Sequence, residues 1–100
     1  MGTCCSLFVG RVNGHTVVRI SGELDHANAS RLEDALALLD GPLVVECAEL
    51  EFIDFTALRV LVDATESHDS VTLRYPSPLL RKLAKLAGWE QLLGLDAASS

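Results

Sequence analysis

The stretch PLVVECAELEFIDFTALRVLVDA, residues 42–64, decides the fold, because it describes a strand that leads directly into a helix. Its first part, PLVVEC, is a nearly continuous apolar run, which is typical of a strand covered on both faces. Asp54 then stands where a carboxylate can accept hydrogen bonds from the first backbone N–H groups of a helix. The positions that follow on one side of the expected helix recur at helical spacing: Leu58, Leu61, Val62 and Thr65.

The segment before this unit predicts a β-hairpin and a first helix. Asn13-Gly14 separates two β-prone runs within residues 7–22, and this dipeptide favours a tight type I′ turn. In the second run alternate residues are apolar or β-branched (Thr16, Val18, Ile20), so one face is expected to be buried. A helix follows within residues 22–41, stopped by Gly41-Pro42, and its apolar face is Leu32, Ala35, Leu36 and Leu39.

The segment after residue 64 predicts one more strand and one more helix. Strict alternation over residues 71–75 places Val71, Leu73 and Tyr75 on one face. In the helix over residues 77–88, Ser77 caps the start, Pro78 fits the first position and Gly88 ends it. The side chains expected to face the core are Leu79, Leu83 and Leu86. A short turn within residues 89–95 is expected to anchor Trp89 on the core.

The predicted architecture is one α/β domain over residues 1–100, with the order β-β-α-β-α-β-α and helices packed on a sheet. Residues 1–5 and 96–100 are expected to be loose ends. Hydrophobic residues make up 49% of the chain, which excludes a disordered protein, and no apolar run is long enough to cross a membrane. The N-terminus lacks the pattern of a signal peptide, so we expect a cytoplasmic location without membrane insertion.

Charge is distributed unevenly along the chain, whose net charge is −6. Between Glu23 and Asp69 there are twelve acidic residues and two basic ones, Arg31 and Arg59. A nucleic-acid ligand is not expected, because phosphate binding needs a basic surface. A basic protein surface is a more natural partner for the acidic half. The uneven charge is explained equally well by a solvated acidic surface that aids solubility.

Patterns of catalytic or metal-binding residues are absent from the sequence. Cys4, Cys5 and Cys47 have no metal-ligand spacing, and Cys47 is expected in the core. The histidines, at positions 15, 26 and 68, are interpreted as solvated loop residues. Acidic residues near strand ends (Asp25, Glu51, Asp54) are expected at one edge of the sheet, without a phosphate loop or a base partner. We therefore expect neither an enzyme, nor a metal site, nor a cofactor.

Two stretches taken together resemble the STAS family, whose members include bacterial anti-sigma factor antagonists. Residues 20–36, ISGELDHANASRLEDAL, resemble its strand-to-helix segment with the pattern G-E-L-D, and residues 42–64 resemble its segment f-i-D-S-S/T-G-L. The similarity continues through residues 71–89. It implies a mixed sheet of four strands with helices mainly on one side. It also implies a protein that docks on a histidine-kinase-like anti-sigma factor and frees a sigma factor.

In this family the kinase phosphorylates a serine at the start of the second helix, and the modified protein releases its partner. Here Phe55 occupies that position, Thr56 falls on the next hydroxyl position and Ala57 replaces the usual glycine. Residues of the preceding strand also depart from the pattern: Glu46, Ala48 and Glu49. Three interpretations of Phe55 remain open. It is an exposed anchor for a partner, it packs on the start of the helix, or the segment has lost its regulatory serine in a protein that is regulated elsewhere. Thr56 is either a displaced phosphoacceptor or a residue whose hydroxyl bonds locally.

The resemblance implies a partner-binding surface at the sheet edge, made of Glu23, Asp25, His26, Asp54, Phe55, Thr56 and Arg59. Two other functions are compatible with the missing serine. One is a STAS subunit of a lipid or solute ABC transporter, which would bind an ABC ATPase. The other is a module that senses a nucleotide or another small ligand, which the acidic surroundings disfavour.

Overall fold

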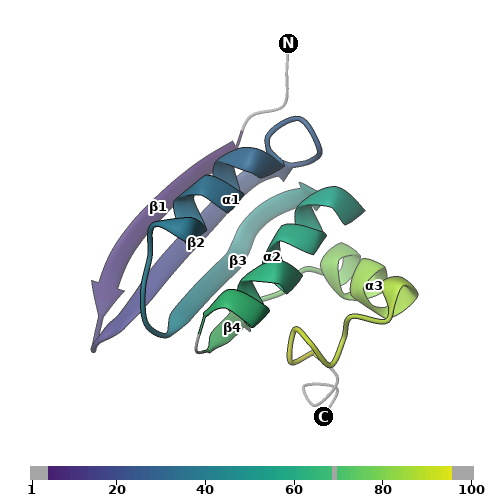
Figure 1. The fold of residues 1–100 in the computed structure, drawn as a ribbon. Coiled ribbons are helices and arrows are strands. Elements are labelled where there is room, and N and C mark those ends of the chain that lie inside the picture. The colour runs from purple at the N-terminus through teal and green to yellow at the C-terminus, as the bar shows by residue number, and fades with distance from the viewer. Residues whose placement is uncertain (1–4, 69, 96–100) are drawn as a thin grey trace.

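The computed structural model describes residues 5–68 and 70–95, and the predicted order β-β-α-β-α-β-α is confirmed (Figure 1). The strands are β1 (Cys5–Val12), β2 (His15–Leu24), β3 (Leu43–Ile53) and β4 (Val71–Arg74). The helices are α1 (Ala29–Ala37), α2 (Phe55–Ser67) and α3 (Pro78–Ala87). No helix in these described ranges is long and apolar enough to span a bilayer.

The four strands form one mixed sheet in the order β1-β2-β3-β4. The β1–β2 hairpin is antiparallel and turns at Asn13 and Gly14, both with positive φ (51° and 82°), as the dipeptide predicts. The other two pairs are parallel, so α1 and α2 are crossover helices. Right-handed crossovers in one direction place both helices on the same face of the sheet, and Figure 1 shows them side by side there.

The core lies between this face of the sheet and the helices. Strand residues that alternate along β2 and β3 point into it, among them Val18, Ile20, Val45 and Ile53. The helices contribute one stripe each, including Leu32, Leu36, Leu58, Leu61, Leu80 and Ala84. The alternation expected for Thr16, Val18 and Ile20 is confirmed, since all three are buried.

No helix within residues 5–68 and 70–95 covers the other face of β3, and this corrects the expectation for residues 42–47. Leu43, Val45 and Cys47 are buried, whereas Val44 and Glu46 between them are partly exposed. The strand is covered on one face only, because both crossover helices lie on the same side. It is also longer than the apolar run, since β3 extends to Ile53.

Three further expectations about burial are wrong. Cys5 is not part of a loose end: it begins β1 and is buried, while residues 1–4 and 96–100 lie outside the described residues. Tyr75 does not continue β4, because the chain leaves the strand at Arg74 and Tyr75 adopts a positive φ of 58°. Leu86 is 68% exposed, because the buried stripe of α3 runs through Leu80 and Ala84.

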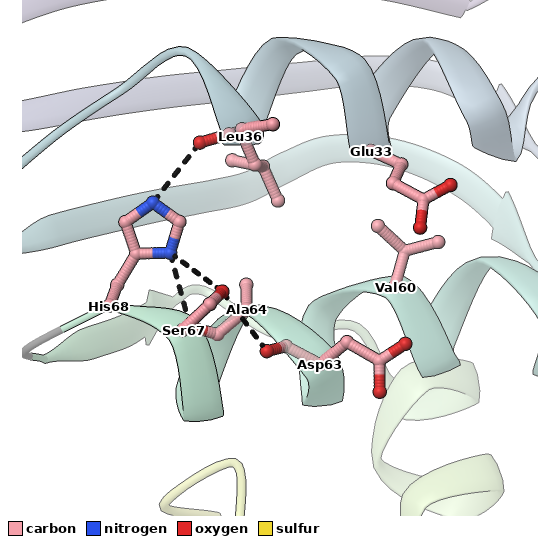
Figure 2. Close-up of a pocket in the computed structure, with 8 residues that line it drawn as sticks. Glu33, Leu36, Val60, Asp63, Ala64, Ser67 and His68 are labelled. Carbon is pink, nitrogen blue, oxygen red and sulfur yellow. Dashed lines mark hydrogen bonds between the residues drawn. The ribbon is translucent and has the colours of Figure 1, made fainter.

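His68 is a structural residue rather than a solvated one, which corrects the interpretation of the histidines. Its Nε2 lies 3.1 Å from the Leu36 carbonyl oxygen and 2.9 Å from that of Leu39, at the end of α1. Its Nδ1 lies 3.2 Å from the Ala64 carbonyl oxygen in α2 (Figure 2). With the proton on Nε2, the ring donates to the Leu36 and Leu39 carbonyl groups, and Nδ1 can accept from the Ser67 hydroxyl at 3.3 Å. Because the His68 backbone N–H also donates to the Ala64 carbonyl oxygen at 3.0 Å, the residue joins the C-terminal end of α2 to the chain at the end of α1.

Replacing His68 with alanine is expected to lower the free energy of unfolding by about 1–3 kcal/mol, because the part-buried carbonyl groups of Leu36 and Leu39 lose a side-chain donor. The exposed His15 provides a matched control, and His15→Ala is expected to change stability by less than about 0.5 kcal/mol. Urea unfolding followed by circular dichroism measures both variants. Equal midpoints for the two variants would contradict a structural role for His68.

Burial raises the pKa of the Cys47 thiol to about 12, from an ordinary value of 9.0. The folded protein therefore keeps the proton to a higher pH than the unfolded chain, and stability is expected to fall as the pH rises above about 9. The loss approaches about 1.4 kcal/mol per pH unit between these two values. Urea midpoints of the wild type and of Cys47→Val, compared from pH 8 to pH 11, isolate this effect. Parallel curves for the two proteins would exclude it.

Candidate functional site

The candidate site is built where the neighbouring parallel strands β2 and β3 end. β2 runs into the turn of residues 25–28, and β3 runs into α2 through Asp54. The two strand ends are joined, because the Asp54 N–H donates to the Leu24 carbonyl oxygen at 3.3 Å. The carboxyl edge of a parallel sheet is where binding sites of open α/β folds usually form. Both loops are therefore presented on one edge.

Asp54 connects the two loops through its side chain. Its Oδ1 accepts the Ala57 N–H at 2.9 Å, which caps α2 as the sequence predicts. Its Oδ2 accepts the His26 N–H at 2.9 Å, and the His26 Nδ1 lies 3.6 Å from the same oxygen. The carboxylate thus holds the start of α2 against the turn that precedes α1. This second role was not predicted, because it needs a contact between residues 28 positions apart.

The turn before α1 is fixed internally by Asn28, which the sequence reasoning did not single out. The Asn28 Oδ1 accepts the Asp25 N–H at 2.8 Å, and the Asn28 Nδ2 donates to the Glu23 carbonyl oxygen at 2.9 Å. The Asp25 Oδ1 accepts the Ala27 N–H at 3.0 Å. Asn28 is buried. Asp and Asn side chains that bond nearby backbone groups are typical of tight turns, and the spacing of Asp25 and Asn28 was the available signal.

Phe55 is the first residue of α2, and its side chain remains 45% exposed. Its ring meets that of Trp89 edge to face, with the centroids 6.5 Å apart and the planes at 79°. Phe55, Thr56, Arg59 and Trp89 line a shallow hollow of about 330 Å³. Phe55 therefore packs on one side and faces solvent on the other, so the structure combines features of the anchor and packing roles.

Trp89 completes this hollow from a distant part of the chain. Gly88 ends α3 in the left-handed conformation, with φ 76°, which glycine adopts without strain. The chain then folds back, and the Trp89 N–H donates to the Ala84 carbonyl oxygen at 2.8 Å. Trp89 is partly buried and packs against the core, as expected. Its contact with Phe55 could not be read from local sequence, because 34 positions separate the two.

The seven residues proposed from sequence lie at the end of β2, in the two loops and in the first turns of α2. Glu23, Asp25 and Asp54 are partly exposed; His26, Phe55, Thr56 and Arg59 are exposed. Their hydrogen bonds join the turn before α1 to Asp54 through His26. Arg59 forms an exposed ion pair with Asp63, with Nε 3.6 Å from Oδ1. Glu51, expected at the same edge, is exposed within β3.

The chemistry of this edge suits contact with another molecule. It combines an exposed aromatic ring, a guanidinium group and carboxylates that are engaged in backbone hydrogen bonds. Across residues 5–68 and 70–95, no three His, Cys, Asp or Glu side chains gather in a way that could hold a metal ion. The edge presents the exposed ring of Phe55 next to polar side chains.

Solved structures with a similar fold include anti-sigma factor antagonists. One from Mycobacterium paratuberculosis superposes with a TM-score of 0.80 at 24% identity, over 88% of this chain and 81% of that one. The Bacillus cell fate determinant SpoIIAA, in its phosphorylated form, gives a TM-score of 0.70 at 18% identity, with 87% of each chain covered. At these identities the similarity shows a common fold.

A STAS domain from Rhodobacter sphaeroides, described as an anti-sigma factor antagonist, gives a TM-score of 0.52 at 17% identity, over 70% of this chain and 85% of that one. No curated protein matches the chain. The family model described as "Mlab, STAS domain" matches residues 7–94, which include all three helices and nearly all of the sheet. The chain therefore belongs to the STAS-domain family.

Proposed function

We propose that this chain is a non-catalytic protein-binding module of the anti-sigma factor antagonist type. Its partner would be an anti-sigma factor or another histidine-kinase-like ATPase in the cytoplasm, from which it frees a sigma factor. Membership of the STAS family and the fold shared with anti-sigma factor antagonists support this proposal. The observation that carries it is the exposed Phe55 at the edge where the two loops meet.

Phe55 has the properties of an interface anchor. Its ring is held by an edge contact with Trp89, and its backbone by the Asp54 cap, so little freedom remains to be lost on binding. Polar groups surround it, with Thr56 and Arg59 beside it in the same hollow. A rigid aromatic side chain within a polar rim is the arrangement that concentrates binding energy in protein interfaces.

Regulation at this edge would differ from that of a family member with serine at the corresponding position. Phe55 has no hydroxyl group and accepts no phosphate. Thr56 is exposed on the first turn of α2, so its hydroxyl is accessible as the alternative phosphoacceptor. A phosphate there would add nearly two negative charges next to Asp54, and the cost of desolvating them beside Phe55, together with repulsion from the neighbouring carboxylates, would weaken docking at this edge.

A second candidate function is favoured by the same residue. A STAS subunit of an ABC transporter would bind its ATPase through this edge without needing a phosphoserine, so the absence of a hydroxyl at position 55 fits that role. Affinity capture of the tagged protein from its native lysate, followed by mass spectrometry, separates the two. Recovery of a small kinase-like ATPase supports the first function, and recovery of an ABC-type ATPase supports the second.

Phe55→Ala is expected to weaken binding of the captured partner by about 30-fold or more, because a central aromatic anchor contributes on the order of 2 kcal/mol. The matched control is Phe8→Ala, which makes the same change at a 62% exposed phenylalanine on β1. Isothermal titration with the purified partner measures both affinities, and thermal unfolding verifies that both variants fold. Comparable weakening by the two substitutions would contradict the anchor role.

Phe55→Ser is expected to create a phosphorylation site for a partner with kinase activity, since the new hydroxyl would stand on the first turn of a capped helix. Phosphate incorporation is measured by mass spectrometry after incubation with the partner and ATP. The double variant Phe55→Ser, Thr56→Ala assigns the modified position, because only modification of the introduced serine survives in it. Absence of phosphate from both the wild type and Phe55→Ser would argue against a kinase partner.

A further inference from the structure

A second surface feature, separate from the Phe55 edge, lies between α1 and α2 (Figure 2). It is a groove of about 200 Å³ that extends toward the C-terminal ends of both helices. Its floor is mostly apolar and its rim carries two carboxylates; it is lined by Glu33, Leu36, Ala37, Val60, Asp63, Ala64, Ser67 and His68. In Figure 2, Glu33 points from α1 toward Val60 of α2, and His68 closes the opposite end.

The groove is strongly biased toward a positively charged occupant. Both rim carboxylates are on exposed residues, and neither α1 nor α2 has a basic residue in its last turn. The C-terminal end of a helix carries a partial negative charge that favours a nearby cation, and His68 already donates to the Leu36 and Leu39 carbonyl groups at the end of α1. Arg59 reaches Asp63, but both side chains are more than half exposed, so this pair is weak and easily exchanged.

The size and lining of the groove match one long side chain rather than a bare ion. A lysine or arginine has an aliphatic stem that can lie along Leu36, Val60 and Ala64, while its charged head reaches water and the rim. A simple cation would gain nothing from the apolar floor. The surrounding chain supports this assignment, since residues 23–69 contain twelve acidic and two basic residues.

We propose that the α1–α2 groove receives a lysine or arginine side chain of the partner protein. Its head would lie beside Glu33 and Asp63, and its stem on the apolar floor. The inference rests on the chain being a protein-binding module, and it extends the proposed interface along α2 from Phe55 to Asp63. It adds a requirement for the partner, which must present a basic side chain about two helical turns from the pocket or patch that contacts Phe55.

The probe for this test is n-butylguanidinium, which reproduces an arginine side chain and requires no partner. In a ¹⁵N–¹H NMR titration of the full chain, saturable shifts are expected at the amides of Leu36, Ala64 and Ser67, with a Kd on the order of millimolar or weaker. Two control compounds are titrated in the same way: guanidinium, which lacks the aliphatic stem, and butanol, which lacks the charge. Each is expected to give smaller, non-saturating shifts at these amides.

Glu33→Lys is expected to weaken n-butylguanidinium binding about ten-fold, because an attraction becomes a repulsion and each contributes roughly a factor of three at about 6 Å in water. Glu51→Lys is the matched control: it makes the same charge change at an exposed β3 residue outside the groove lining, and less than about two-fold weakening is expected. Similar weakening by both variants, or shifts spread over the acidic surface, would overturn the proposal in favour of diffuse charge attraction.

Sedimentation velocity of the same proteins tests a second copy as the occupant. The alternative arises because α3 carries the exposed Lys82, Lys85 and Leu86. Concentration-dependent self-association that Glu33→Lys abolishes would assign the groove to α3 of another copy and overturn the proposal. A monomer that still binds the probe would support it. The NMR titration and the sedimentation experiment do not use the partner protein. Their results therefore stand even if Phe55→Ala fails to weaken partner binding.

Discussion

The Asp54 carboxylate is the contact on which the candidate site depends. One oxygen caps α2, and the other accepts the N–H of His26 from the turn before α1. A single side chain therefore sets the start of α2 relative to the end of the neighbouring strand. Because Phe55 is the next residue, its direction is fixed by the same two bonds. The position of the exposed ring is a consequence of the cap, and any change at Asp54 would disturb the fold and the proposed interface together.

The second constraint is that both crossover helices, α1 and α2, cover one face of the sheet. The parallel pairs β2–β3 and β3–β4 require crossovers, and crossovers of one hand place α1 and α2 next to each other. Two features follow from this packing. The helices end close together, so that His68 bonds the Ala64 carbonyl group of α2 through its backbone N–H and the Leu36 carbonyl group of α1 through Nε2. The surface between them forms the groove that carries Glu33 and Asp63 on its rim. The Phe55 edge and the groove therefore lie toward opposite ends of the same pair of helices.

The sequence predicted what depends on nearby residues. The Asn13-Gly14 turn, the Asp54 cap and the order of the elements follow from turn chemistry and hydrophobic periodicity, and all three are confirmed. The errors concern distant contacts. His68 looked like a loop histidine because its partner carbonyl groups in α1 are 29 and 32 residues away. The exposure of Leu86 likewise depends on how α3 is rotated against α2 and β3, which three leucines at helical spacing do not determine.

The two proposed contacts along α2 would contribute differently to binding. An aromatic ring such as Phe55 adds affinity through desolvation, and its effect is little changed by salt. An acidic groove on an exposed surface attracts a basic partner over about 8 Å at physiological salt, so it acts mainly on the association rate and on orientation. Together the two contacts fix the partner at two points of one rigid helix, which selects one docking direction. If the chain binds through both, raising the salt concentration should slow association while leaving dissociation, set by Phe55, nearly constant.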